Sequence, residues 1–224
     1  MNQSTLSKEA LTYFEEREKL CELCRKFYEK GWASGTGGGM TIKVAGDIAL
    51  IAPSGVQKEE LQPSDLFAVK LNASLNHGCE IIDKPENLKI SACTSIFTNI
   101  FNLKASAASI IHSHSVNAVM LTKITKAQEL TISGYEMLKG IEGCTYFSSH
   151  TIPILDNVEH ECDLAEDIGK VILQYPKAYA VLVRDHGFYV WGKSWQQAKI
   201  HAECYDYLFG AIVQEKSLQA LSLI

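Results

Sequence analysis

Three histidines have the spacing and surroundings of metal ligands. His112 and His114 follow the apolar run 107–111, and side chains two residues apart in an extended chain point to the same side. His186 follows a second apolar run, residues 178–183. Three neutral imidazoles leave one position open for a substrate, which is the usual arrangement of a catalytic zinc site. On these residues alone, a chance His-x-His pair on the surface remains an equal alternative.

Two glycine-containing segments have the composition of anion-binding loops. In the run 35–39 the backbone can approach a ligand closely, and its N–H groups can hold an anion. The segment 52–58 adds a hydroxyl group, another glycine and an ammonium group. Either segment alone is more often a plain turn, but together they predict a phosphate site. The candidate phosphate-binding residues are Gly37, Gly38, Gly39, Ser54, Gly55 and Lys58.

Hydrophobic periodicity alternates between helical and strand patterns along the chain. Helices are predicted at 6–30, 94–103, 115–122, 163–174 and 195–215. Strands are predicted at 40–44, 48–52, 66–71, 107–111, 178–183 and 187–191, and the polar segment 72–88 is predicted to be a loop. Because helices and strands are interleaved and hairpins also occur, we expect a mixed sheet covered by helices on both faces.

Composition and charge narrow the classes of protein. The chain has 224 residues, and we expect a single domain over residues 1–224. A net charge of -5 without a long basic run argues against a nucleic-acid partner. No apolar run reaches the roughly 18 residues of a membrane span, and residues 1–19 lack the apolar core of a secretory signal, so we expect a cytoplasmic protein without membrane contact. Seven irregularly spaced cysteines indicate reduced thiols, and the Cys21-x-x-Cys24 pair is expected to pack inside a helix.

A series of short motifs runs from about Leu20 to Phe209, nearly the whole chain. They include IHSHS at 111–115, YEMLKGI at 135–141 and VLVRDHG at 181–187. The others lie at 31–32, 35–39, 52–59, 91–94, 189–192 and 204–209. In this order the motifs resemble the class II aldolase/epimerase superfamily, whose members use zinc and act on sugar phosphates. The resemblance implies a three-layer α/β/α fold with a central mixed, largely antiparallel sheet, a zinc ion, and a homotetramer with sites near subunit interfaces.

The same resemblance implies a lyase that acts on a small phosphorylated sugar. His112, His114 and His186 match zinc ligands, and Glu136 matches a catalytic acid/base. Cys93 matches a substrate-contacting position that sugar-phosphate aldolases of the superfamily fill with an acid, so the expected reaction is removal of water rather than aldol cleavage. Two alternatives stay open: an aldolase or epimerase for another sugar phosphate, and a non-catalytic interaction protein on the same fold.

Overall fold

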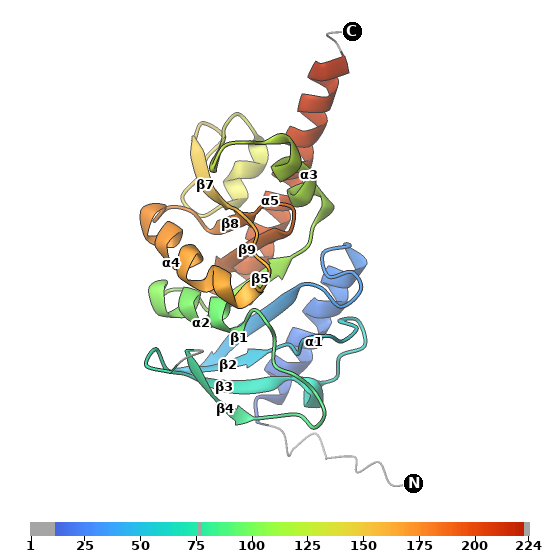
Figure 1. Cartoon of the computed structure of the whole chain (residues 1–224), viewed down its shortest axis with the longest axis vertical. Coiled ribbons are helices and arrows are strands. Elements are labelled where there is room, and N and C mark those ends of the chain that lie inside the picture. The colour runs from blue at the N-terminus through green and yellow to red at the C-terminus, as the bar shows by residue number, and fades with distance from the viewer. Residues whose placement is uncertain (1–11, 76–77, 222–224) are drawn as a thin grey trace.

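The computed structural model describes residues 12–75 and 78–221. Within them, one nine-stranded sheet of order β4-β3-β2-β1-β5-β9-β8-β7-β6 runs through the molecule (Figure 1). Neighbouring strands are antiparallel except β7 and β8, which confirms the mixed, largely antiparallel sheet. The strands are β1 (Gly39–Ala45), β2 (Ile48–Ile51), β3 (Phe67–Leu71), β4 (Cys79–Asp83), β5 (Ser109–Ser113), β6 (Glu129–Ile132), β7 (His150–Leu155), β8 (Ala180–Val183) and β9 (Gly187–Gly192).

Helices cover both faces of the sheet, as the three-layer expectation requires. The helices are α1 (Phe14–Glu29), α2 (Thr94–Leu103), α3 (Val116–Ile124), α4 (Leu164–Gln174) and α5 (Trp195–Leu221), with short 3-10 helices η2 (Pro63–Asp65), η3 (Glu136–Gly140) and η4 (Glu161–Asp163). One apolar core lies under α1, α3 and α5, and the other lies under α2 and α4. The side chains of β5 alternate between the two cores. Ile110 packs in the core under α2 and α4, and Ile111 packs in the core under α1, α3 and α5.

The edge of the sheet differs from the prediction. Segment 72–88 is not a loop throughout, because β4 pairs with β3 inside it. The side chains of β4 are half-buried or exposed, so this strand leaves no apolar pattern in the sequence. Its last residue, Asp83, forms an ion pair with the buried guanidinium of Arg17 on α1. The sequence patterns also do not predict β6 and β7.

The first helix contains the Cys21-x-x-Cys24 pair in the packing role expected of it. Both cysteines are free and buried in the core under α1. Burial raises the pKa of each thiol to about 12, which keeps them protonated. The helix begins at Phe14, and residues 6–11 of the predicted helix lie outside the described part of the chain.

No helix in the described part of the chain has the length and apolar character that a bilayer crossing requires.

Candidate metal centre

Two adjacent antiparallel strands bring the three histidines together. His112 lies within β5, His114 follows its end, and His186 precedes the start of β9. Ser113 pairs with Phe188 across the two strands, so the end of β5 lies beside the beginning of β9. This strand pairing unites residues that the sequence places far apart.

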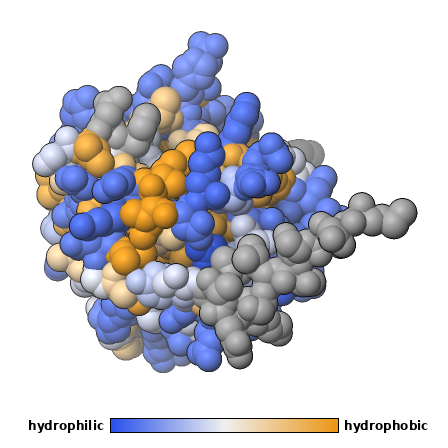
Figure 2. All heavy atoms as spheres, turned by 90° about the horizontal axis from the view of Figure 1, so that it is seen from below, coloured by the Kyte–Doolittle hydropathy of each residue, from blue (hydrophilic) through white to orange (hydrophobic). Residues whose placement is uncertain are grey.

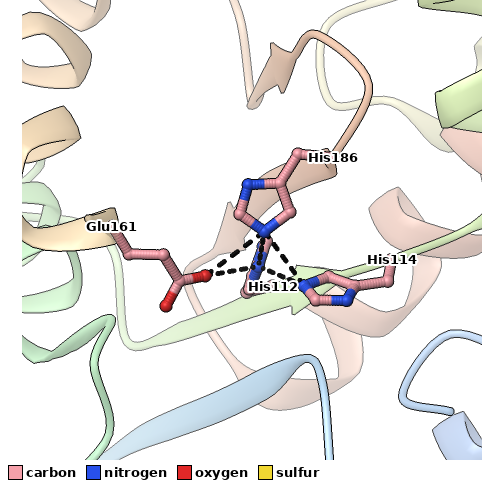
Figure 3. A group of neighbouring side chains, drawn as sticks. All are labelled: His112, His114, Glu161 and His186. Carbon is pink, nitrogen blue, oxygen red and sulfur yellow. Dashed lines mark hydrogen bonds and ion pairs between the residues drawn. The ribbon is translucent and has the colours of Figure 1, made fainter. Parts of the chain in front are cut away.

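The imidazoles point toward one another, and a carboxylate joins them (Figure 3). The Nε2 atom of His114 lies 2.9 Å from that of His112 and 3.1 Å from that of His186. The Nε2 atoms of His112 and His186 are 3.2 Å apart. Glu161 Oε1 lies 3.2 Å from Nε2 of His112 and 3.3 Å from Nε2 of His186. The four ligand atoms all lie within 4.8 Å of one another.

Hydrogen bonds at the opposite ring nitrogens orient two of the imidazoles. His112 Nδ1 lies 3.2 Å from the Phe188 carbonyl oxygen, and His186 Nδ1 lies 3.2 Å from Asn157 Oδ1. Both partners are acceptors, so each Nδ1 carries the proton and each Nε2 presents a lone pair to the centre. Lone pairs 3.2 Å apart cannot bond to each other, but a cation between them satisfies both. The donor set therefore fits a metal ion.

Burial favours the neutral, metal-binding form of two of the imidazoles, His112 and His114. It lowers the pKa of His112. Burial, followed by the neighbouring imidazoles, lowers the pKa of His114 to about 3. The ring of His112 stacks on that of Tyr189, with centroids 4.1 Å apart and an interplanar angle of 8°. The stacking holds the ring of His112 in place, and the lowered pKa values favour neutral rings for His112 and His114 at neutral pH.

Glu161 is the member of the cluster that sequence reasoning missed. It begins η4, just before α4, in the polar segment 158–163. Acidic residues are common just before a helix, because they interact favourably with its N-terminus. The sequence therefore does not distinguish Glu161 as a metal ligand from such a residue. Its Oε2 lies 3.2 Å from the Cys93 thiol, and the Tyr189 hydroxyl lies 3.6 Å from the same sulfur.

The two glycine-containing segments lie side by side and are joined by Lys58. This side chain is buried, and its Nζ donates to the carbonyl oxygens of Thr36 at 3.2 Å and Val56 at 3.3 Å. Its charge acts on His114, lowering the pKa of that imidazole further. Gly37 lies directly against His114, since a Cβ at this position would be 2.5 Å from its Nδ1.

The other candidate phosphate-binding residues occupy the same two segments. Gly38 has a φ of +70°, and a Cβ there would lie a tight 3.1 Å from the carbonyl oxygens of His112 and Trp32, whereas Gly39 begins β1. Ser54 is half-buried and forms a bridge to Lys89, and Gly55 is exposed.

Glu136 is not brought into the cluster of its own chain. It begins η3, its side chain is 70% exposed, and it forms an ion pair of 2.5 Å with Lys139. It is absent from the group formed by His112, His114, His186 and Glu161 among the described residues.

An apolar pocket of about 620 Å³ adjoins the cluster. Glu161 is part of its wall, and Ile81 and Ile90 supply apolar surface. β4 forms one side, and it exposes Ile81 and Ile82 by 44% and 48%. Figure 2 views the molecule from below, the side on which β4 lies in Figure 1, and shows apolar residues gathered near the middle of this face. An apolar group of a ligand could therefore lie next to the metal centre.

The model of the class II aldolase and adducin N-terminal domain family matches residues 18–213. The chain belongs to this family. Curated relatives carry the name methylthioribulose-1-phosphate dehydratase. The chicken protein (Gallus gallus) is 44% identical over 208 residues, which cover 89% of this chain and 83% of the relative. The human protein is 43% identical over 203 residues, which cover 88% and 82%.

A solved structure supports the fold assignment. An L-fuculose 1-phosphate aldolase superposes with a TM-score of 0.75 at 17% sequence identity, covering 93% of this chain and 89% of the aldolase chain. At this identity the likeness shows the shared fold alone, and it confirms the class II aldolase-like architecture. The family and the His3Glu group together indicate a metal ion.

Proposed function

We propose that this chain is a methylthioribulose-1-phosphate dehydratase of methionine salvage. It removes water from 5-methylthioribulose 1-phosphate to give 5-methylthio-2,3-dioxopentyl phosphate. It works in the cytoplasm as a homotetramer of class II aldolase-like domains, with one zinc ion per chain. The observation that carries the proposal is the convergence of three buried or half-buried imidazoles in a chain that is 44% identical to the chicken protein of that name.

His112, His114 and His186 hold the zinc through their Nε2 atoms. When bound, the ion supplies a Lewis acid that polarises the C2 carbonyl of the substrate. The hydrogen bonds from Nδ1 of His112 and His186 keep the lone pairs directed at the ion. The phosphate is held by Lys58 and Ser54, with backbone N–H groups of Gly37, Gly38, Gly39 and Gly55. Because the phosphate is remote from the bond that breaks, these contacts serve to position the substrate.

Glu136 is the proposed acid/base. The C2 carbonyl makes the C3 proton acidic, and Glu136 removes it. The same carboxyl group then returns a proton to the departing C4 hydroxyl, so that water leaves and the enol tautomerises to the diketone. Glu136 is exposed and outside the histidine cluster of its own chain. We therefore propose that it serves the metal centre of a neighbouring copy in the tetramer.

The pocket beside Glu161 is proposed to take the methylthio end of the substrate. Its Ile81 and Ile90 side chains match an apolar thioether better than a hydroxyl group. Cys93, which contacts Glu161, is proposed to contact the substrate near this end.

The activity is tested by incubating the purified protein with 5-methylthioribulose 1-phosphate and following the substrate by mass spectrometry. We expect loss of one water molecule without cleavage of the carbon chain. Release of a three-carbon fragment would instead indicate an aldolase. An unchanged substrate in the presence of zinc would contradict an enzymatic role on this sugar phosphate and leave the interaction protein as the better interpretation.

The role of Glu136 is tested by mixing two inactive variants. Glu136→Gln should lower kcat by roughly a hundredfold or more, because general acid–base catalysis contributes about that much. His114→Ala should be inactive for a different reason, the loss of a metal ligand. Refolding the two variants together should restore part of the activity, because some mixed sites combine an intact cluster with an intact Glu136. If mixing restores nothing, Glu136 does not act across a subunit boundary.

A further inference from the structure

We propose that Glu161 is a fourth protein ligand of the metal ion, so that a carboxylate closes the centre until substrate displaces it. The inference rests on the proposed metal centre and goes beyond it, because three histidines alone leave a position open. The expected site of three imidazoles is thus replaced by a closed His3Glu site in the substrate-free protein.

Five of the six distances between the ligand atoms are close to those of a tetrahedral metal site. Zinc bonds to nitrogen and oxygen are about 2.0–2.2 Å long, which places tetrahedral ligand atoms about 3.3–3.5 Å apart. The three nitrogen–nitrogen separations are 2.9, 3.1 and 3.2 Å. The separations from Glu161 Oε1 to His112 and His186 are 3.2 and 3.3 Å. The carboxylate oxygen therefore lies as close to His112 and His186 as these two lie to each other, and within 4.8 Å of His114.

The charges of Glu161 Oε1 and of the two imidazole nitrogens nearest to it also favour a cation between them. The protons of His112 and His186 are engaged at Nδ1, so neither Nε2 has a proton to donate to Glu161. A carboxylate oxygen facing two lone pairs is repelled unless a positive charge lies between them. A metal ion satisfies all the electron-pair donors at once.

The second carboxylate oxygen is held away from the histidines. The Cys93 thiol donates to Oε2 at 3.2 Å, and the Tyr189 hydroxyl donates to the same sulfur at 3.6 Å. Only Oε1 is left to face the centre, which favours binding through a single oxygen.

The position of Glu161 is fixed by the packing of two helices. Cys93 directly precedes α2, and Glu161 lies three residues before α4 begins. The two helices touch closely, because Asn99 of α2 donates to the Ala165 carbonyl oxygen of α4 at 2.5 Å. The carboxylate is thus delivered to the cluster by rigid elements rather than by a chance side-chain rotamer.

Displacement is feasible because Glu161 borders the apolar pocket. Its side chain is 24% exposed, and the residue forms part of the pocket wall. A substrate oxygen arriving from the pocket can take the place of Oε1 while Oε2 stays near Cys93. The carboxylate then remains beside the bound substrate.

The test compares Glu161→Gln with Glu159→Gln, using metal ions alone. Glu159 is exposed on the same segment and is not part of the cluster, so it is a matched control for the change from carboxylate to amide. Zinc affinity is measured by competition with a chromophoric chelator. Loss of a residue that hydrogen-bonds to a metal ligand lowers metal affinity about 10- to 100-fold. Loss of a direct ligand should therefore weaken zinc binding at least about tenfold. Glu159→Gln should bind zinc as the unmodified protein does.

Cobalt substitution supplies a second readout. The visible absorption of Co²⁺ depends on the number and type of its ligands, so its bands should shift in Glu161→Gln and stay unchanged in Glu159→Gln. Unchanged affinity and spectrum in Glu161→Gln would overturn the inference while leaving a three-histidine centre, and with it the proposed function, intact. Failure of the unmodified protein to bind zinc or cobalt would overturn both.

Discussion

Replacing Gly37 by Ala should disturb the metal centre without touching a ligand. The Cβ atom of an alanine at this position would lie 2.5 Å from His114 Nδ1 and 2.8 Å from its Cε1. Ordinary contacts begin at 3.4 Å, so the ring and the loop must separate by about 0.9 Å, the difference between 3.4 and 2.5 Å. Metal–ligand distances tolerate deviations of only about 0.2 Å. A shift of this size therefore removes His114 Nε2 from bonding distance or strains it severely.

The expected consequence is a loss of zinc affinity of at least about tenfold, equivalent to about 1.4 kcal/mol. The assay is competition with a chelator at neutral pH. Gly39→Ala is the matched control, because a Cβ there would meet Phe97 at an ordinary 3.5 Å. Gly39→Ala should bind zinc normally. If Gly37→Ala also binds zinc with unchanged affinity, the loop yields to the added methyl group and the reasoning from His114 fails.

Three further changes test the site. His114→Ala should leave the purified protein without bound zinc, and a full zinc load by elemental analysis would exclude this residue as a ligand. Lys58→Met keeps the length of the side chain but removes its charge, so the KM for the phosphorylated substrate should rise by roughly tenfold to a hundredfold, as expected for loss of a charged hydrogen bond, with a smaller effect on kcat. An unchanged KM would remove Lys58 from the phosphate site. Burial lowers the pKa of His112, and that of His114 to about 3, so below about pH 6.5 the unfolded chain binds more protons than the folded one. The metal-free protein should therefore lose stability to urea as the pH falls from about 6.5 toward 3, by up to about 1.4 kcal/mol per unit for each histidine. His114→Asn should flatten this dependence, and an identical slope in the variant would contradict the assignment.

Features that depend on the regular alternation of side chains along a strand or helix could be predicted from the sequence. The two-residue spacing of His112 and His114 places both imidazoles on one side of β5 because strand side chains alternate. The close approach at Gly37 follows from the absence of a Cβ, although the sequence does not say which side chain it approaches. The apolar periodicity of α2, α4 and the central strands likewise appears in the sequence because their side chains must reach a core.

Strands at the edge of the sheet could not be predicted in this way. β4 is held by its ladder with β3 and by the ion pair of Asp83 with Arg17, and neither interaction leaves an apolar pattern. A strand leaves a recognisable alternating apolar pattern in the sequence when one of its faces is buried. A strand with exposed side chains gives no such signal.

The sequence by itself therefore determined the candidate zinc ligands, the glycine-rich loops and the layered α/β fold, because each depends on local spacing or on a recurring motif. Only the tertiary structure decided which groups meet. The pairing of β5 with β9 brings His186 to His112, and the packing of α4 on α2 brings Glu161 to the same point. It also leaves Glu136 exposed and outside the cluster of its own chain. Such contacts depend on strand pairing and helix packing between segments distant in sequence, and no local pattern of residues records them.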